Sequence, residues 1–236
     1  MLRLITDFDG PIMDVCDRYY RVYQRCLHLT KQPQQPIKVL SQAEFWQLKR
    51  ARVPERKIAL LSGLNSEQAR IFAHLRRTNV HSLPYLVYDR AYESAIATLE
   101  KLQQLGFELV VMTMRKEREL NNALQTHDLE RFFSPHLRYC FDDDYLITID
   151  TKDKPLLMAK ALQELPAAAN TWMVGDTEAD IITAKAHNIQ IISVLSGIRD
   201  RQQLAAYQPD AIADNLAQAA EIILAQKAIS FSQFSF

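Results

Sequence analysis

The stretch LITDFDGPIMD, residues 4–14, decides how the rest of the chain is interpreted. Its apolar beginning indicates a buried strand, and two acids one residue apart, Asp7 and Asp9, follow directly. Asp-Gly pairs are common in turns, so the pair Asp9-Gly10 taken alone is explained by a loop. Whether the two carboxylates carry chemistry depends on which other side chains the fold brings to the same place.

The composition limits which classes of protein are compatible with this sequence. The chain has 236 residues, of which 48% are hydrophobic and 24% charged, typical of one globular domain or of one domain with an insertion. A formal net charge of zero gives nucleic-acid binding no support. The three cysteines form no close pair, which favours reduced thiols. No run is long enough to span a membrane, and the amino terminus is too short and acidic for a signal peptide. We expect a cytoplasmic protein without nucleic-acid or membrane partners, of undetermined oligomeric state.

Short apolar runs alternate with helical patterns along most of the chain. The predicted strands are 2–6, 107–113, 137–141, 171–175, 189–195 and 210–214, and the predicted helices are 116–127, 155–165, 178–187 and 214–227. Continuous apolar strands that alternate with helices indicate a parallel sheet covered on both faces. With right-handed crossovers, the fold class is a doubly wound, Rossmann-like α/β domain.

One segment breaks this alternation. Residues 15–88 show helical periodicity and no convincing strand, so we expect a helical cap domain inserted into a core made of residues 1–14 and 89–236. Between residues 14 and 88 there are thirteen Lys and Arg but five Asp and Glu, which leaves the remainder acidic. A basic cap over an acidic core suits an anionic substrate, although a solvated helix surface explains the same charges.

Polar groups follow several of the predicted strands. In an open parallel sheet, ligands bind beyond the carboxyl ends of the strands. The groups expected at this edge are Asp7 and Asp9 after the first strand, Thr113 at the end of the second, Asp176 after the fourth with Asp180 four residues on, and Lys154 in the linker before a helix. The placement of all these groups at one edge is harder to explain by purely structural roles than the presence of any one of them.

Four motifs in this order resemble the haloacid dehalogenase-like hydrolase superfamily, in its phosphatase branch with a helical cap after the first strand. The motifs are DFDG (7–10), VVMT (110–113), KP (154–155) and VGDTEADI (174–181). The carboxyl-terminal part is similar to phosphoglycolate-phosphatase-like members. The resemblance covers residues 1–14 and 89–226, whereas the cap matches only in position and helical character.

The resemblance implies a Mg²⁺-dependent phosphomonoester hydrolase that acts on a small phosphorylated metabolite through an aspartyl-phosphate. Asp7 is the expected nucleophile, and the side chain of Asp9 is the expected general acid and base. Asp7, the backbone carbonyl of Asp9, and Asp176 are expected to hold Mg²⁺, with Asp180 supporting them without touching the ion. A second acid at position 9 favours phosphoryl transfer over dehalogenation.

The same resemblance implies the groups that hold the phosphoryl oxygens. They are the Thr113 hydroxyl, the backbone N–H of Met114 and the Lys154 ammonium, and Gly10 is expected to contribute to substrate binding. Lys152 is a rival to Lys154, but Pro155, expected as the first helical residue, favours Lys154.

Position 11 departs from the family pattern, which places Thr after DxDG. Pro11 has neither a hydroxyl nor an N–H, so one hydrogen bond of the turn must be absent or replaced. Three alternatives stay open. They are a phosphomutase of the same family, a phosphonate hydrolase using a Schiff-base lysine such as Lys49 or Lys57, and a catalytically silent phosphate-ligand binding protein, at which Pro11 hints.

Other candidate features have simpler explanations. FDDDY (141–145) lacks the glycine of a calcium loop and is expected to be a solvated acidic loop. The cap aromatics Tyr19, Tyr20, Tyr23, Phe45 and Trp46 are expected in the core of the cap. Four cap cations, Arg18, Arg21, Lys49 and Arg50, are expected at its surface, where any of them is able to meet a substrate anion.

Overall fold

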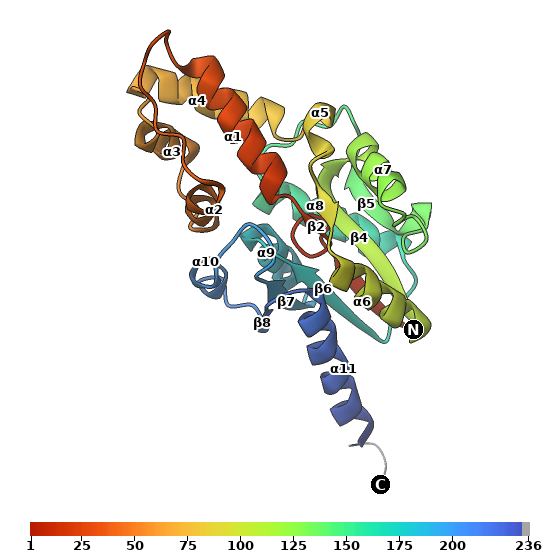
Figure 1. Cartoon of the computed structure of the whole chain (residues 1–236). Helices are drawn as coiled ribbons and strands as arrows, with labels where there is room; N and C mark the ends of the chain where they lie inside the picture. The colour runs from red at the N-terminus through yellow and green to blue at the C-terminus, as the bar shows by residue number, and fades with distance from the viewer. Residues whose placement is uncertain (233–236) are drawn as a thin grey trace.

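Six parallel strands form the main sheet of the computed structural model, which describes residues 1–232 (Figure 1). The strand order is β5-β4-β1-β6-β7-β8. The strands are β1 (Leu2–Thr6), β4 (Phe107–Lys116), β5 (Arg138–Phe141), β6 (Asn170–Gly175), β7 (Gln190–Val194) and β8 (Ala211–Ala213). The predicted doubly wound α/β fold is confirmed, and chain order reverses beside β1, where β4 and β6 flank it.

Alternating side chains of the strands bury both faces of the sheet. Ile5, Val110 and Met173 pack with helices α8 (Asp150–Glu164) and α9 (Glu178–Ala186) on one face. Leu4 and Trp172 pack on the other face, under a second set of helices. That set is α6 (Glu93–Gln104), α7 (Glu117–Thr126) and α11 (Leu216–Ser232). Because neighbouring residues of a strand point to opposite faces, each apolar run supplies both layers.

Two of the boundaries that differ from the prediction bear on the position of site residues. Strand β4 continues three residues past the predicted end at Thr113 to Lys116, so Thr113 lies inside the strand and not at its end. Helix α8 begins at Asp150, five residues before Pro155, which therefore lies inside the helix and is not its first residue. The earlier start is stabilised by the Asp153 carboxylate, whose Oδ2 accepts the N–H groups of Thr148 at 2.6 Å and Ile149 at 3.1 Å.

The segment of residues 15–89 is helical, and Figure 1 shows most of its helices grouped apart from the sheet. Its helices are α1 (Cys16–Thr30), α2 (Gln42–Arg50), α3 (Glu55–Leu61), α4 (Ser66–Asn79) and α5 (Leu83–Leu86). They enclose a hydrophobic cluster of their own, in which the rings of Tyr23 and Phe45 stack 4.7 Å apart. Tyr19, Tyr20 and Trp46 pack against this cluster, as expected for cap core. The domain limits 15–88 stay a prediction.

A two-stranded antiparallel ladder joins the helical segment to the sheet domain. It pairs β2 (Met13–Asp14) with β3 (Arg90–Ala91), the two places where the chain leaves and returns. Two-residue strands are too short to leave a periodic pattern in a sequence, so this ladder was not predicted. It holds the two connections side by side beneath the helices.

The remaining described elements are the short helices η1 (Pro135–Leu137) and α10 (Arg201–Ala205). Within residues 1–232, none of the helices combines the length and apolar character that crossing a lipid bilayer requires. Residues 233–236, which the sequence assigns to the core domain, lie outside the described residues.

The helical segment's own core makes a stability prediction. Phe72 is fully buried there and its ring contacts that of Tyr23, so Phe72→Ala should lower the free energy of unfolding by about 3–5 kcal/mol. Leu60 is 48% exposed, and Leu60→Ala should change the same quantity by less than about 1 kcal/mol. Urea titrations followed by circular dichroism compare the two. Equal small losses would show that the cluster does not stabilise this segment.

Candidate active site

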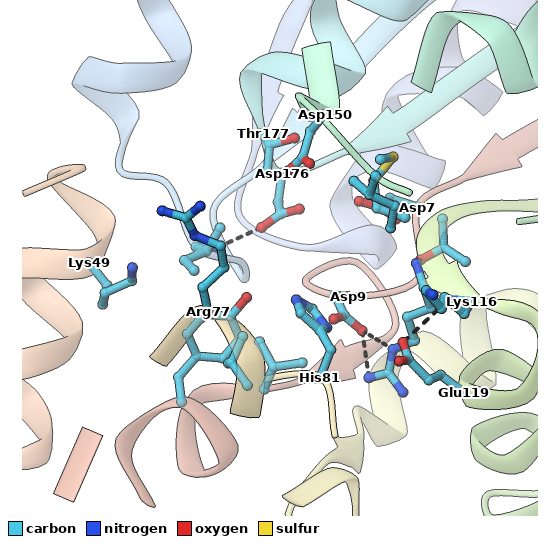
Figure 2. A pocket seen from close by; sticks show the side chains of 18 of the residues that line it. Asp7, Asp9, Lys49, Arg77, His81, Lys116, Glu119, Asp150, Asp176 and Thr177 are labelled. Carbon is cyan, nitrogen blue, oxygen red and sulfur yellow. Dashed lines mark hydrogen bonds and ion pairs between the residues drawn. The ribbon is translucent and has the colours of Figure 1, made fainter. Parts of the chain in front are cut away.

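A cavity of about 520 Å³ lies where the carboxyl edge of the sheet faces the helical segment. The sheet domain contributes Asp7, Asp9 and Asp176 to its lining, and the helical segment contributes Lys49 and Arg77. Figure 2 shows Lys49 across this cavity from Asp7. The helical segment thus gives the cavity cations and no acid, whereas the sheet domain gives it acids together with the cations Arg115, Lys116 and Arg199.

Asp7 follows the last residue of β1 and is held by both its neighbours and its backbone. Its N–H donates to the Val174 carbonyl at 2.8 Å, and its Oδ1 accepts the Phe8 N–H at 2.7 Å. Its Oδ2 lies 2.9 Å from the Nζ of Lys154. Burial raises the pKa of Asp7 to about 7, because the nearby Lys154 ammonium only partly offsets the loss of water.

Asp176 follows β6, next to β1, and lies against glycine backbone. Its Oδ2 accepts the Ile198 N–H at 2.6 Å. A Cβ on Gly197 would lie 1.8 Å from that Oδ2, and a Cβ on Gly10 would lie 2.5 Å from the Asp176 Cγ. Burial, and then the charges of Asp7 and Asp180, raise the pKa of Asp176 well above its usual range.

Asp180 lies in the first turn of α9 and is fully buried. Its Oδ2 accepts the N–H of Thr177 at 3.0 Å and the Thr177 hydroxyl at 2.7 Å. Its Oδ1 lies 2.5 Å from the Nζ of Lys154, which therefore bridges Asp7 and Asp180. Lys152 is exposed, so of the two rival lysines the structure brings Lys154 to the carboxylates.

These acids fit a divalent cation. One carboxylate oxygen from each of Asp7, Asp176 and Asp180 lies within 4.8 Å of the others, and all three residues are buried. With the acids ionised, the single ammonium of Lys154 leaves a formal charge of minus two in this group, which a dication neutralises. Hard carboxylate oxygens are the ligands that Mg²⁺ prefers. We refer to Asp7, Asp176, Asp180 and Lys154 as the acidic cluster.

Asp9 lies two residues beyond Asp7 and has different neighbours. Its Oδ1 accepts from the Nε of Arg115 at 2.8 Å, and its Oδ2 accepts from the Nη2 of Arg18 at 2.7 Å. Burial alone would raise the pKa of Asp9, but the charges of Arg115 and Arg18 outweigh it and hold that pKa well below its usual range. Asp9 is therefore an anion in this arrangement.

Asp89 completes a closed set of ion pairs around Asp9. Its Oδ1 lies 3.0 Å from the Nε of Arg18, and its Oδ2 accepts from the Nη2 of Arg115. The side chains of Arg18, Arg115 and Asp89 are at most 1% exposed. Asp9, Arg18, Asp89 and Arg115, called the ionic ring below, carry two positive and two negative charges and are formally neutral.

The ionic ring corrects one sequence-based expectation and contains residues that the sequence did not single out. Arg18 was expected at the surface, but it is fully buried, and its guanidinium group forms ion pairs with the carboxylates of Asp9 and Asp89. Arg115 has no role in the sequence-based expectations, which include Asp89 only as the first residue of the core segment 89–236. The sole signal for Arg115 is its place two residues after Thr113, while nothing local distinguishes Asp89.

Thr113 and Met114 line the cavity from β4. Thr113 is 2% exposed, and its hydroxyl oxygen accepts the N–H of Arg115 at 3.2 Å. Gly10 lies against Asp176, and its carbonyl accepts from the Ser196 hydroxyl at 2.8 Å. The binding roles expected for Thr113, Met114 and Gly10 stay predictions.

The turn after Asp9 forms without the N–H that Pro11 lacks. The N–H groups of Ile12 and Met13 both donate to the Phe8 carbonyl, at 3.2 and 3.0 Å, and the Gly10 N–H donates to the Met13 carbonyl at 2.9 Å. Gly10 adopts a φ of 93°, a conformation that glycine tolerates. Backbone bonds therefore organise this turn, and Pro11 by itself gives no reason to expect a silent protein.

Comparison with known proteins agrees with the fold and the motifs. A family model described as HAD-hydrolase-like matches residues 151–219. Pyrophosphatase PpaX of Anoxybacillus flavithermus is 30% identical over 57% of this chain and 60% of its own length. Phosphoglycolate phosphatase of Vibrio vulnificus is 25% identical over 68% of this chain and 66% of its own. The chain thus spans less than two thirds of either relative.

A solved structure extends the agreement in fold to nearly the whole chain. The haloacid dehalogenase-like family hydrolase SP0104 of Streptococcus pneumoniae superposes with a TM-score of 0.66 over 95% of this chain and 97% of its own, at 18% identity. At that identity the likeness concerns the fold alone. The motifs, the family model over residues 151–219 and the curated relatives make this chain similar to haloacid dehalogenase-like hydrolases, and the solved structure agrees with them in fold.

The contact between Gly197 and Asp176 is testable. A methyl group at position 197 must displace the Asp176 carboxylate, so Gly197→Ala should weaken Mn²⁺ binding by about tenfold or more, measured by calorimetry. Gly106→Ala is the control, since its Cβ meets nothing within 4 Å although its φ of 78° makes it mildly destabilising. Unchanged Mn²⁺ affinity in Gly197→Ala would show that Asp176 is not a ligand in the place the structure gives it.

Proposed function

We propose that this protein is a Mg²⁺-dependent phosphatase that hydrolyses small phosphorylated metabolites through an aspartyl-phosphate on Asp7. The observation that carries the proposal is the acidic cluster, which leaves two negative charges uncompensated beside a cavity. Asp7, Asp176 and the Asp9 carbonyl would hold the cation, and Asp180 would anchor Lys154. Bound Mg²⁺ supplies charge neutralisation, so that a carboxylate and a phosphoryl group are able to approach each other.

The proposed reaction has two displacements at phosphorus. An oxygen of Asp7 forms a bond to phosphorus while the bond to the leaving oxygen breaks, and that oxygen takes a proton from Asp9. Water then attacks the phosphorus of the aspartyl-phosphate, Asp9 accepts its proton, and the Asp7–phosphorus bond breaks to release phosphate. Lys154 stays beside Asp7 throughout and offsets charge on the phosphoryl oxygens.

The ionic ring bears on the role of Asp9. Its arginines favour the anion, which suits the second displacement, where Asp9 accepts a proton. The first displacement needs the protonated acid. A phosphoryl dianion beside Asp9 favours that form, because a neighbouring negative charge raises the pKa of a carboxyl group. We propose that substrate binding prepares Asp9 for the first displacement in this way.

The cations that the helical segment gives the cavity favour an anionic substrate. A second cavity of about 480 Å³ adjoins the first and shares Lys49 and Arg77 with it. Its lining adds Arg56 and Arg76 against a single acid, Glu55. Phosphoglycolate and pyrophosphate, suggested by the names of the two relatives, are the first candidates, followed by sugar phosphates and nucleotides.

With three free cysteines in the described structure, we propose a cytoplasmic setting.

Phosphate release from a panel of these esters tests the proposal. Wild type should release phosphate with Mg²⁺ and lose this activity with excess chelator, and restored Mg²⁺ should recover it. Asp7→Asn should lower kcat by about 10⁴-fold or more, because an amide cannot attack phosphorus. Asp128→Asn, at a residue 86% exposed on its side chain and not part of the cavity lining, is the matched control and should leave turnover unchanged.

Each other outcome points to a different function. Equal inactivity of wild type and Asp7→Asn over the panel would favour the silent phosphate-ligand binding protein. An isomeric phosphate ester in place of free phosphate would favour the phosphomutase. Activity that persists in chelator would contradict the use of the acidic cluster as a cation site.

Arg77 allows a test of the substrate's charge. It is exposed, lines both cavities, and lies on α4 of the helical segment. Arg77→Gln should raise KM for an anionic ester by about fivefold with little change in kcat, since one exposed charge contributes about 1 kcal/mol at short range. Arg70→Gln on the same helix changes a residue paired with Glu67 and should leave KM unchanged. An identical KM in both variants would place the substrate away from α4.

A further inference from the structure

The ionic ring brings together four separate parts of the chain. Asp9 lies in the turn after β1, Arg18 in the first turns of α1, Asp89 just before β3, and Arg115 near the end of β4. Arg18 therefore belongs to the helical segment, whereas Asp9 and Arg115 belong to the sheet domain. The β2–β3 ladder pairs the two connections of the helical segment, and these connections follow Asp9 and Asp89 closely along the chain.

Each oxygen of the Asp9 carboxylate has its own arginine. Arg115 holds Oδ1 with Nε at 2.8 Å and Nη2 at 2.6 Å, and Arg18 holds Oδ2 with Nη2 at 2.7 Å. A carboxylate that is hydrogen-bonded at both oxygens by two different arginines cannot rotate freely about its side-chain bonds. The side chain of Asp9 remains 23% exposed and lines the cavity, so it is fixed and still accessible.

Asp89 keeps the two arginines in place. It contacts Arg18 through Oδ1 and Arg115 through Oδ2, and its side chain is 1% exposed. Without Asp89, two buried guanidinium groups would face a single carboxylate, and their repulsion would favour a different arrangement. The guanidinium group of Arg115 also lies 5.0 Å from the ring of Phe8, which restricts it further.

We propose that Arg18 and Asp89 are positioning residues that orient the Asp9 carboxylate for proton transfer, Arg18 being supplied by the helical segment. The inference rests on the proposed function, because it assigns Asp9 a proton to deliver. Its consequence is that proton transfer depends on how the helical segment lies against the sheet domain. If the helical segment moves away from the sheet domain, Arg18 moves with it, and Asp9 then loses the hydrogen bond from Arg18 and keeps only that from Arg115.

Stability alone is a weak reason for such a ring. Burying two ion pairs removes four charges from water, and well-packed apolar groups of similar volume are often as stable. A fixed carboxylate orientation is a gain that apolar replacements cannot supply. General acid catalysis contributes about 10²–10⁴-fold to a rate, and it requires the acid within hydrogen-bonding reach of the leaving oxygen.

The test compares two esters of different leaving group. Nitrophenyl phosphate releases a stable phenolate that needs no proton, whereas an alkyl phosphate such as glycerol phosphate must have its leaving oxygen protonated. Arg18→Met and Asp89→Asn should each lower kcat for the alkyl ester by about 30-fold or more and for the aryl ester by less than about threefold. Arg18→Lys should recover part of the alkyl activity, because an ammonium reaches only one of the two acids.

The control variant is Arg25→Met, about two turns further along α1. Arg25 is exposed and does not line either cavity, so this change should leave both esters unaffected. Thermal unfolding measured on every variant detects loss of the fold. If Arg18→Met does not fold, Asp89→Asn carries the comparison, since a neutral amide of the same shape retains part of the ring's packing.

Three results would overturn the inference. Equal losses for the two esters in folded variants would show a general structural role. A rise in KM with kcat unchanged would make Arg18 a substrate contact. Unchanged alkyl turnover would show that Asp9 needs neither residue. Failure of the proposed function is distinguishable from all three, because wild type would then hydrolyse neither ester.

Discussion

Mutual repulsion among three buried carboxylates is the constraint on which the site depends. One oxygen from each of Asp7, Asp176 and Asp180 lies within 4.8 Å of the others, and Lys154 is the ammonium that bridges two of them. The chain reaches this crowded arrangement because β1 and β6 are neighbours whose carboxyl ends coincide. Glycine backbone, such as that of Gly197, leaves room for the acids, and burial together with the neighbouring carboxylate charges raises the pKa values of Asp7 and Asp176. A divalent cation resolves this conflict more simply than protonation does.

In the ionic ring, which begins only two residues after Asp7, the charges are balanced. Asp9 and Asp89 are matched by Arg18 and Arg115, so no net charge remains for a cation to neutralise. This difference separates the proposed roles of Asp7 and Asp9, which their shared motif leaves ambiguous: one carboxylate belongs to a group that lacks positive charge, and the other to a group that is already balanced. It also connects the helical segment to the site, because Arg18 crosses from that segment to the sheet domain.

The sequence predicts most of the sheet domain, and the reasons for its failures are physical. The six strands were found because buried parallel strands are continuous apolar runs, and β1 was placed within its observed limits. The start of α8 was missed because Asp153 stabilises the helix end ahead of Pro155, whereas Pro155 is the stronger local signal. Of the site, the motif residues that the structure brings together were identified in advance. Arg18 and Asp89 were not, since their burial depends on partners far away along the chain, and a single sequence gives no sign of such pairing.

The proposed function depends on a cation in the acidic cluster that unites Asp7 with Asp176. A crystal structure of the protein with Mg²⁺ and a fluoroberyllate, a mimic of the phosphoryl group, would reveal this cation. We expect an ion about 2.0–2.1 Å from one oxygen of each residue, with the mimic joined to Asp7. An ion bound elsewhere, or a bound mimic that leaves Asp7 in contact with Lys154 alone, would contradict it.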